Sequence, residues 1–262
     1  MDYKNLNILV TGASSGIGEE FCRQFHSLGS NIILVARRED RLKKITDELN
    51  FKKQGSAYSI VADLTQDDDL KKIANFIKEN RIDILVNNAG CGSFGYFEEL
   101  NIENEVNQVK LNIIATQVLA HSVIPQLKAR RAGGIISVSS IAAFQPLPFM
   151  ATYSATKVFN YQHSLGLREE LREFGVRVLT VCPGPTATEF GGVARVPGKM
   201  TGLPRDSVEA VVRESIRAFS RDKQVVVTGF KSKLIALQSK LMPKLISVKL
   251  VKRILLSSLR TQ

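Results

Sequence analysis

The sequence predicts an α/β protein, a single domain built on a doubly wound parallel sheet of about seven strands with helices on both faces. Short runs of branched apolar residues alternate with segments whose apolar residues recur every three or four positions, which is typical of strands between helices. The length of 262 residues also suits one open α/β domain. Because parallel strands need crossover connections, helices are expected to cover both faces of the sheet.

Seven segments of the chain are expected to be strands. They are residues 7–11, 31–35, 57–61, 82–86, 134–139, 176–181 and 224–228. Between them, apolar residues recur at helical spacing, as in Phe21, Phe25 and Leu28. A stretch rich in Gly and Pro follows the sixth strand and is longer than an ordinary connection. We therefore expect one domain over residues 1–229, with a lid around 184–204, and a basic tail over 230–262.

The first expected strand leads into a glycine-rich turn, Thr11-Gly12-Ala13-Ser14-Ser15-Gly16-Ile17-Gly18, and then into a helix. Glycines allow a tight turn and a close approach of the backbone to a pyrophosphate, while the helix N-terminus supplies N–H groups. The spacing differs from the generic dinucleotide motif, and a glycine cluster alone can be a mere turn. Its place between a strand and a helix favours nucleotide binding. The expected contacts are Gly12, Ser14, Ser15, Gly16, Ile17 and Gly18.

The end of the second strand, Ala36-Arg37-Arg38, indicates which dinucleotide is bound. A site selective for NAD would carry an acidic residue there to bind the ribose hydroxyls. Ala36 occupies that place, and the planar guanidinium of Arg37 suits a 2′-phosphate. We therefore expect NADP(H), with NAD(H) as the alternative and Arg38 as a second contact. Both arginines could instead belong to a solvated charge cluster with Glu39 and Asp40.

Polar residues also follow the third and fourth strands. Open α/β sheets bind ligands at the carboxyl ends of their strands, so these residues are expected to contact the cofactor. They are Asp63, Leu64, Asn88, Ala89 and Gly90. Asp63 could accept a hydrogen bond from the adenine amino group or cap the next helix. The residues from Asn87 to Gly90 could equally form only a turn, because Asn and Gly tolerate positive φ.

Ser140 and the segment Tyr153-Ser154-Ala155-Thr156-Lys157 carry the most specific chemical signal. On a helix, Tyr153 and Lys157 share one face, and a nearby cation is expected to lower the pKa of a phenol toward the working pH. Ser140, at the end of the fifth strand, can donate a hydrogen bond to a carbonyl oxygen that becomes negative. Taken singly, each residue also has an ordinary structural role: Tyr packs, Lys is solvated and Ser caps a helix.

These motifs together resemble the short-chain dehydrogenase/reductase family over about residues 5–229. The family's order and spacing are seen in Thr11-Gly12-x-x-x-Gly16-x-Gly18, Asn87-Asn88-Ala89-Gly90, Asn112, Ser140, Tyr153-x-x-x-Lys157 and Pro183-Gly184. The resemblance implies a Rossmann-type catalytic domain in which Tyr153 is the acid/base and Ser140 orients the carbonyl or hydroxyl group. It implies that Lys157 binds the nicotinamide ribose and tunes Tyr153, while Asn112 holds a water linked to Lys157.

The resemblance also concerns the segment after the sixth strand. Thr188 matches the position that contacts the nicotinamide carboxamide, and Thr186 lies beside it, so both are expected cofactor contacts together with Pro183 and Gly184. One departure concerns Ser15, because many NADP-preferring members have a basic residue there. The preference for NADP(H) therefore depends on the two arginines. The tail from Lys231 onward lies outside the shared region.

The resulting prediction is an NADP(H)-dependent oxidoreductase that transfers hydride between the nicotinamide and a hydrophobic ketone or secondary alcohol. An NADP(H)-binding regulatory protein without turnover is the alternative. Apolar residues after strand ends are expected to line the substrate pocket, although any of them could be core. They are Phe94, Phe97, Phe144, Leu147, Phe149 and Phe190. The resemblance also suggests a homo-oligomer built on the helices around Asn112 and Lys157.

The net charge of +11 is concentrated in the tail. Residues 223–262 hold nine Lys or Arg and no Asp or Glu, which leaves +2 for residues 1–222. The tail has no aromatic residue after Phe230 on which bases could stack, so a nucleic-acid partner is not expected. Three cysteines without paired or metal-like spacing predict reduced thiols and no metal site. No basic leader and no run of 18 apolar residues is seen, so a cytoplasmic protein is expected.

Leucines in the tail recur at helical spacing, as on one face of a helix flanked by lysines. The stripe consists of Leu234, Leu237, Leu241, Leu245, Val248, Leu255 and Leu259. An amphipathic helix lying on an anionic membrane surface over residues 231–260 fits this pattern. Pro243 predicts two helical pieces, and Lys252 falls on the apolar face. The same stripe could instead pack on the body or on a second subunit.

Overall fold

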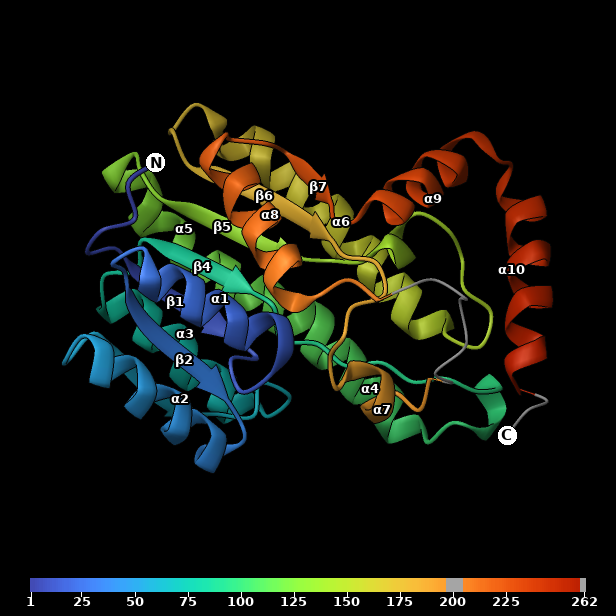
Figure 1. Cartoon of the computed structure of the whole chain (residues 1–262), viewed down its shortest axis with the longest axis horizontal. Helices are drawn as coiled ribbons and strands as arrows, with labels where there is room; N and C mark the ends of the chain where they lie inside the picture. The colour runs from blue at the N-terminus through green and yellow to red at the C-terminus, as the bar shows by residue number, and fades with distance from the viewer. Residues whose placement is uncertain (197–204, 260–262) are drawn as a thin grey trace.

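The computed structural model describes residues 1–196 and 205–259, without the side chains of Lys240 and residues 257–259. Its seven strands form one parallel sheet in the order β3-β2-β1-β4-β5-β6-β7 (Figure 1). The strands are β1 (Asn7–Thr11), β2 (Asn31–Ala36), β3 (Ala57–Val61), β4 (Ile84–Asn87), β5 (Gly134–Val138), β6 (Arg177–Cys182) and β7 (Val225–Val227). The predicted fold class is confirmed, and the predicted strand boundaries differ by at most two residues.

Helices cover both faces of the sheet. They are α1 (Gly16–Ser27), α2 (Glu39–Lys52), α3 (Asp67–Glu79), α4 (Ile102–Val109), α5 (Thr116–Arg130), α6 (Ala151–Arg172), α7 (Phe190–Val193), α8 (Val208–Ser220), α9 (Phe230–Leu241) and α10 (Lys244–Leu259). Between α4 and α5 lies a π-helix, η2 (Lys110–Ala115), and two short 3₁₀ turns are η1 (Phe97–Glu99) and η3 (Ile141–Ala143). The part of the predicted lid that falls on residues 197–204 lies outside the described residues.

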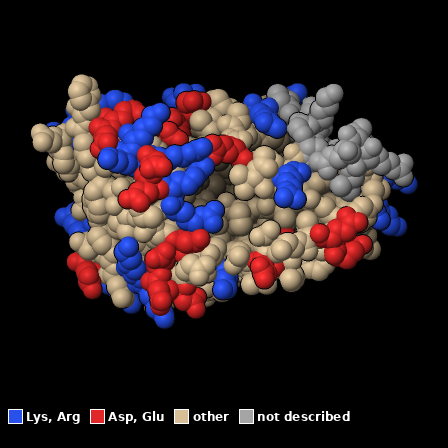
Figure 2. All heavy atoms as spheres, turned by 90° about the horizontal axis from the view of Figure 1, so that it is seen from below, with Lys and Arg blue, Asp and Glu red and all other residues tan. Residues whose placement is uncertain are grey.

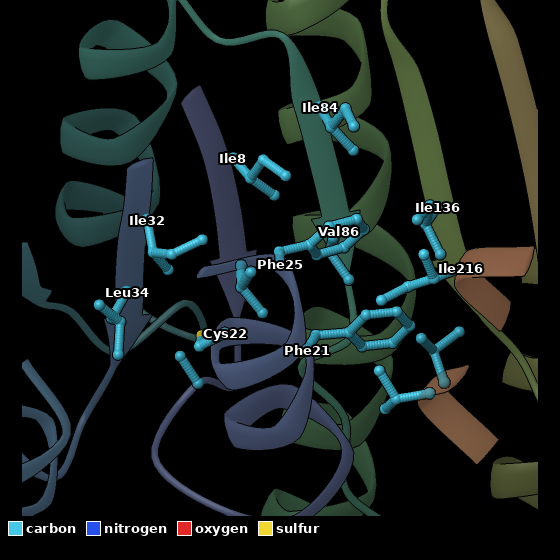
Figure 3. Close-up of a cluster of buried hydrophobic side chains, with 14 of the residues drawn as sticks. Ile8, Phe21, Cys22, Phe25, Ile32, Leu34, Ile84, Val86, Ile136 and Ile216 are labelled. Carbon is cyan, nitrogen blue, oxygen red and sulfur yellow. The ribbon is translucent and has the colours of Figure 1, made fainter. Parts of the chain in front are cut away.

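Alternate residues of each strand supply two separate cores. Ile8 and Val10 of β1 face α1 and α8, where Phe21 and Ile216 pack against them, while Leu9 faces the opposite layer (Figure 3). That layer consists of α3, α5 and α6. Because side chains alternate across a strand, a run of branched apolar residues fills both cores at once. These buried layers hold the strand ends in fixed positions.

The order of the strands reverses between β1 and β4, since β2 and β3 extend to one side and β5 to β7 to the other. Crossovers leave the sheet in opposite directions at that point, which opens a crevice at the carboxyl ends of the two strands. The glycine turn follows β1, and the Asn87–Gly90 segment follows β4. The topology therefore brings the two predicted cofactor segments to one place.

The tail forms two helices, α9 and α10, separated at Pro243 as predicted. We call this pair the tail hairpin. The prediction that the leucine stripe forms one face is wrong, because Leu255 is buried whereas Leu234, Leu237, Leu241 and Leu245 are exposed. The break at Pro243 rotates the second helix relative to the first, so one continuous periodicity does not describe both. Among the described residues, no helix is long and apolar enough to cross a membrane.

Candidate active site

One cavity of about 650 Å³ joins the crevice at the sheet edge to the tail hairpin. Figure 2 shows the face seen from below hollowed near its centre, with Lys and Arg side chains at the edge of the hollow. One side, which we call the sheet-edge wall, comes from the turns after the strands and from α6. It includes Gly12, Ser14–Ile17, Asn88–Gly90, Ser140, Tyr153 and Lys157. The cavity therefore gathers most of the predicted site residues.

The glycine turn is shaped by close approaches of backbone to backbone. Gly12 has φ +65°, and a Cβ there would lie 2.9 Å from Ala89 Cα. A Cβ on Gly18 would lie 2.3 Å from the Gly12 carbonyl oxygen, so that position admits only glycine. Gly12 lines the cavity, whereas Gly18 lies behind it and packs the helix against the turn. The resulting cradle, at the N-terminus of α1, fits a pyrophosphate.

The two arginines after β2 have different contacts. Arg38 donates hydrogen bonds to Ser14 Oγ at 3.1 Å, to Ser15 Oγ at 2.6 Å and to Glu189 Oε2 at 2.7 Å, which engages all three of its nitrogens. The side chain of Arg37 is 66% exposed, and among the described residues its hydrogen-bond partner is Asp63, through Oδ2 at 3.4 Å. Arg37 is therefore the guanidinium that remains available to a phosphate, and Arg38 braces the glycine turn.

Asp63 is held by its own turn. Its Oδ1 accepts hydrogen bonds from the backbone N–H of Thr65 at 3.0 Å and from Thr65 Oγ1 at 2.8 Å. Burial raises the pKa of this carboxyl, but the Thr65 hydrogen bonds and Arg37 outweigh it and hold the pKa below its usual value. Asp63 and Leu64 both line the cavity. The helix that follows begins with Gln66 at its N-cap, so Asp63 does not have the alternative role of capping that helix.

Hydrogen bonds hold the segment after β4, residues 88–90, against the end of β1. Asn88 Nδ2 donates to the Thr11 carbonyl at 2.9 Å, and Thr11 Oγ1 accepts from the N–H groups of Asn88 and Ala89 at 3.0 Å. The segment lines the cavity with Asn88, Ala89 and Gly90, and none of the residues from Asn87 to Gly90 has the positive φ that the turn interpretation assumed. The interpretation as a mere turn is therefore wrong, and the expected cofactor contacts stay a prediction.

Asn112 lies behind the cavity, in the π-helix η2, and is fully buried. Its Nδ2 donates to the Cys91 carbonyl and to Thr156 Oγ1, both at 2.9 Å, and its Oδ1 accepts from the Cys91 N–H at 3.0 Å. A Cβ on Gly90 would lie 3.1 Å from Asn112 Oδ1 and 3.4 Å from Lys157 Nζ, so the amide and the ammonium meet at Gly90. Local π-helical turns are frequent at functional sites, and this one aims Asn112 between α6 and the segment after β4.

Ser140, Tyr153 and Lys157 meet at the centre of the sheet-edge wall. Ser140 Oγ accepts a hydrogen bond from the Ala142 N–H at 3.1 Å, which turns its own O–H toward other acceptors, and it is hydrogen-bonded with Tyr153. Lys157 Nζ donates to the Val138 carbonyl at 3.0 Å and lies 5.8 Å from the centre of the Tyr153 ring. The spacing of four residues on α6 thus places phenol and ammonium in one cavity.

Burial shifts the pKa values of both Tyr153 and Lys157. It raises the pKa of Tyr153 to about 12, against the lowering effect of the hydrogen bond with Ser140. It also lowers the pKa of Lys157 from 10.5 to about 8. The predicted lowering of the Tyr153 pKa is therefore wrong for the ligand-free protein, because burial raises the pKa more than the hydrogen bond with Ser140 lowers it. At neutral pH the phenol carries its proton.

The segment after β6 closes the cavity over the glycine turn. Pro183, Gly184, Thr186 and Thr188 all line it. A Cβ on Gly16 would lie 3.0 Å from Thr188 Cγ2, which shows how closely this segment approaches the turn. Phe190 packs against Tyr153 with ring centres 5.2 Å apart. These contacts place apolar surface directly beside the phenol.

The tail hairpin supplies the opposite side of the cavity, which we call the tail wall. It consists of Ile235, Gln238, Ser239, Met242, Ser247, Leu250, Val251, Ile254 and Leu255. Gln145, in the segment after β5, fastens both helices, since its Oε1 accepts hydrogen bonds from Ser239 Oγ at 3.1 Å and from Ser247 Oγ at 3.0 Å. No motif in the sequence indicated this wall.

The six apolar residues predicted for the pocket have different positions. Leu147 and Phe190 line the cavity, while Phe94 and Phe149 belong to a small buried cluster with Met150 and Tyr153. Phe97 is more than half exposed, Phe144 packs against Tyr161 with ring centres 5.3 Å apart, and neither lines the cavity. Cys91 also lines the cavity, and burial raises the pKa of its thiol. Glu189 is a further lining residue that no motif indicated; it pairs with Arg38 and Arg41.

The sequence matches one family model and is similar to several known proteins. The sequence model of the short chain dehydrogenase family matches residues 6–197. A very-long-chain 3-oxoacyl-CoA reductase of Pyricularia oryzae is 34% identical over 209 residues, which are 78% of this chain and 63% of that protein. The chain spans less than two thirds of the length of this and of another fungal relative.

Solved structures are also similar. A short-chain dehydrogenase from Sphingobium yanoikuyae in complex with NADPH is 33% identical with a TM-score of 0.80, and the match covers 85% of this chain and 87% of that one. The bulky-bulky ketone specific alcohol dehydrogenase from Comamonas testosteroni is 32% identical with a TM-score of 0.76, and the match covers 85% of each chain.

Proposed function

The chain belongs to the short-chain dehydrogenase family, and we propose that it is an NADP(H)-dependent oxidoreductase that interconverts a hydrophobic ketone and its secondary alcohol. The observation that carries this proposal is the single cavity in which the glycine cradle and Arg37 continue into Ser140, Tyr153 and Lys157 and then into an apolar wall. An oxidoreductase needs a cofactor site and an acid/base beside a substrate pocket.

The cradle and the sheet edge fit a nicotinamide dinucleotide phosphate. The close-packed glycine turn would hold the pyrophosphate, Arg37 the 2′-phosphate, and Lys157 the ribose next to the nicotinamide. Thr186 and Thr188 would bind the carboxamide. When bound, the dinucleotide supplies the hydride in reduction and accepts it in oxidation. The relative from Sphingobium yanoikuyae, solved with NADPH, supports this choice.

The residues of the chain would then handle the proton. In reduction, Ser140 donates a hydrogen bond to the carbonyl oxygen, and Tyr153 transfers its phenolic proton to that oxygen as the carbon receives hydride. A phenol with a pKa of about 12 is fully protonated at neutral pH and suits this direction. The Lys157 ammonium, near Asn112 at Gly90, stabilises the phenolate that remains. In oxidation the same proton returns to Tyr153.

The substrate we propose is bulky and apolar at the carbonyl. Leu147, Met150 and Phe190 line the cavity beside Tyr153, and most of the tail wall is aliphatic. The names of two relatives support this class, because one is a bulky-bulky ketone specific alcohol dehydrogenase and the other a very-long-chain 3-oxoacyl-CoA reductase. A small polar carbonyl would leave this surface unfilled.

A ketone panel tests the proposal directly. Oxidation of NADPH and of NADH is followed with ketones of increasing chain length, from acetone to long-chain aryl and alkyl ketones. We expect turnover with NADPH that rises with substrate size. Tight NADPH binding without turnover of any member would favour the alternative, a regulatory protein. The Tyr153→Phe variant serves as the background.

We also propose the organisation that accompanies this activity. Residues 1–229 would be the catalytic domain, 184–204 its lid and 230–262 the tail. A homo-oligomer would form across α4, η2 and α6, where Ile102, Val106, Ile114 and Val158 are exposed. Sedimentation velocity of the parent and of Val106→Glu tests the contact, since a charge at the centre of an apolar interface should dissociate it.

A further inference from the structure

The outer surface of the tail hairpin is unusually apolar. Leu241 and Leu245, on either side of Pro243, are both 78% exposed. Further exposed apolar side chains on the hairpin are Phe230, Leu234, Leu237, Ile246, Leu250 and Ile254. Leu234, Leu237 and Leu241 also border a shallow groove on α9. Figure 1 shows α9 and α10 projecting from the end of the molecule, away from the sheet.

Packing against the body does not account for this surface, because the hairpin already uses its other side for that. Ala236 and Leu255 are buried, and Ser239 and Ser247 bind Gln145. Lys233 pairs with Glu214 of α8, which fastens the start of α9. The leucines around Pro243 are therefore exposed after the hairpin has been docked on the body.

The same surface is cationic. Exposed basic residues of the hairpin are Lys231, Lys233, Lys244, Lys249, Lys252 and Arg253, and the sequence has no Asp or Glu after Asp222. Lys233 has its partner in Glu214. Exposed leucines within a field of cations are typical of helices that lie in the interface of an anionic membrane.

We propose that the tail hairpin docks on an anionic lipid bilayer, with its leucines in the interface and its lysines against the headgroups. A second copy of the chain fits this surface less well. In a symmetric contact between two copies, the cations of one hairpin would face the cations of the other, and the hairpin has no acidic residue to pair with them.

Docking would also place the substrate cavity next to the lipid. Leu250 and Ile254 are exposed and line the cavity as well, so docking would bring two side chains of the cavity wall next to the proposed bilayer. An apolar ketone dissolved in the membrane would reach the cavity without crossing water. This consequence rests on the proposed function, whereas docking itself does not and is measured without turnover.

Co-sedimentation of the full chain with vesicles tests docking. One set of vesicles is phosphatidylcholine alone, and the other also contains phosphatidylglycerol. We expect binding to the anionic vesicles at low salt and a strong loss at high salt. Leu241→Gln with Leu245→Gln should lower the partition coefficient at least about tenfold. Lys249→Gln with Lys252→Gln should lower it about fivefold per charge removed.

Matched variants elsewhere on the chain are the controls. Phe51→Gln with Val61→Gln removes exposed apolar surface outside the tail, and Lys43→Gln with Lys44→Gln removes two exposed charges of α2. Both pairs should bind vesicles like the parent. The leucine pair does not line the cavity, so it should retain the parent's NADPH binding in solution, which shows that it is folded.

Three outcomes overturn the proposal. The first is equal binding of the leucine pair and the parent, and the second is equal binding to neutral and anionic vesicles. In the third, the leucine pair lowers the oligomeric mass measured by sedimentation velocity without changing vesicle binding, which would make this surface a contact between copies. Because no step requires a ketone, failure of the ketone panel leaves the vesicle result interpretable.

Discussion

The two walls of the cavity are held in place by different forces. On the sheet-edge wall, the turns are held by close backbone approaches and by hydrogen bonds of Thr11 and Asn88, and behind it a Cβ on Gly18 would lie only 2.3 Å from a carbonyl oxygen. On the tail wall, helices α9 and α10 are fastened by a few side chains, of which Gln145 is the most central. The proposed proton donor therefore lies on the sheet-edge wall, and the proposed substrate pocket also depends on the tail wall, whose contacts can be altered separately.

The largest expected loss of activity comes from a substitution on the sheet-edge wall. Tyr153→Phe removes the proposed proton donor and keeps the ring that packs on Phe190, so kcat should fall by about 10²- to 10⁴-fold with little change in cofactor affinity. Tyr161→Phe is the matched control, because it removes a hydroxyl from the same helix outside the cavity. Turnover of Tyr153→Phe within tenfold of the parent would show that Tyr153 is not the acid/base.

The next effect separates the two arginines. Arg37→Ala should weaken NADPH binding by about 10- to 150-fold and leave NADH nearly unchanged, because only NADPH carries the 2′-phosphate. Arg41→Ala removes an exposed arginine from the same region that does not line the cavity. Fluorescence titration with both cofactors measures the difference. Equal losses for NADPH and NADH would remove Arg37 from the 2′-phosphate site.

We expect the buried ammonium of Lys157, on the sheet-edge wall, to lower the free energy of unfolding. Its folded pKa of about 8 lies below the ordinary 10.5, so the buried ammonium destabilises the fold at any pH where it is charged. Lys157→Met should therefore raise the free energy of unfolding by about 2 kcal/mol at neutral pH, after a loss of about 1 kcal/mol for the hydrogen bond to Val138. The same variant should lose turnover.

The sign of the pH dependence follows from the direction of that shift. Below about pH 8 the ammonium is charged in the folded and unfolded protein, and its cost is fully present. Between about pH 8 and 10.5, Lys157 is neutral in the folded protein but still charged in the unfolded protein. The stability advantage of Lys157→Met should therefore fade as the pH rises through this range. Denaturant titrations between neutral and alkaline pH, with the exposed Lys110→Met as control, measure this. An advantage that grows with pH would contradict the assigned shift.

The smallest effect should come from the tail wall. Gln145→Leu removes the acceptor of two hydrogen bonds to the hairpin, so the Michaelis constant for a bulky ketone should rise about three- to tenfold. The kcat with a small ketone should not change, because the acid/base is untouched. Exposed Gln224→Leu is the control. An equal loss of kcat with the small and the bulky ketone would show that a change in the tail wall also affects the sheet-edge wall.

Local sequence determined the sheet, the glycine turn and the position of Tyr153 and Lys157 relative to each other. Strands and helices here follow from short-range periodicity, and residues four apart on a helix share a face whatever packs around them. The strand order then brings the ends of β1 and β4 together. Gly12, Asn88 and Ser140 were therefore identifiable from their places at strand ends.

Only the tertiary structure decided how the tail packs and how Tyr153 ionises. Ser239 and Ser247 meet Gln145 across 94 and 102 residues of chain, and no periodicity encodes such a contact. A leucine stripe has the same spacing whether it faces the body or the solvent, so Leu255 and Leu241 could not be told apart before the helices were packed. The pKa of Tyr153 likewise depends on how much water its neighbours exclude, which is a property of the folded cavity and not of the segment around it.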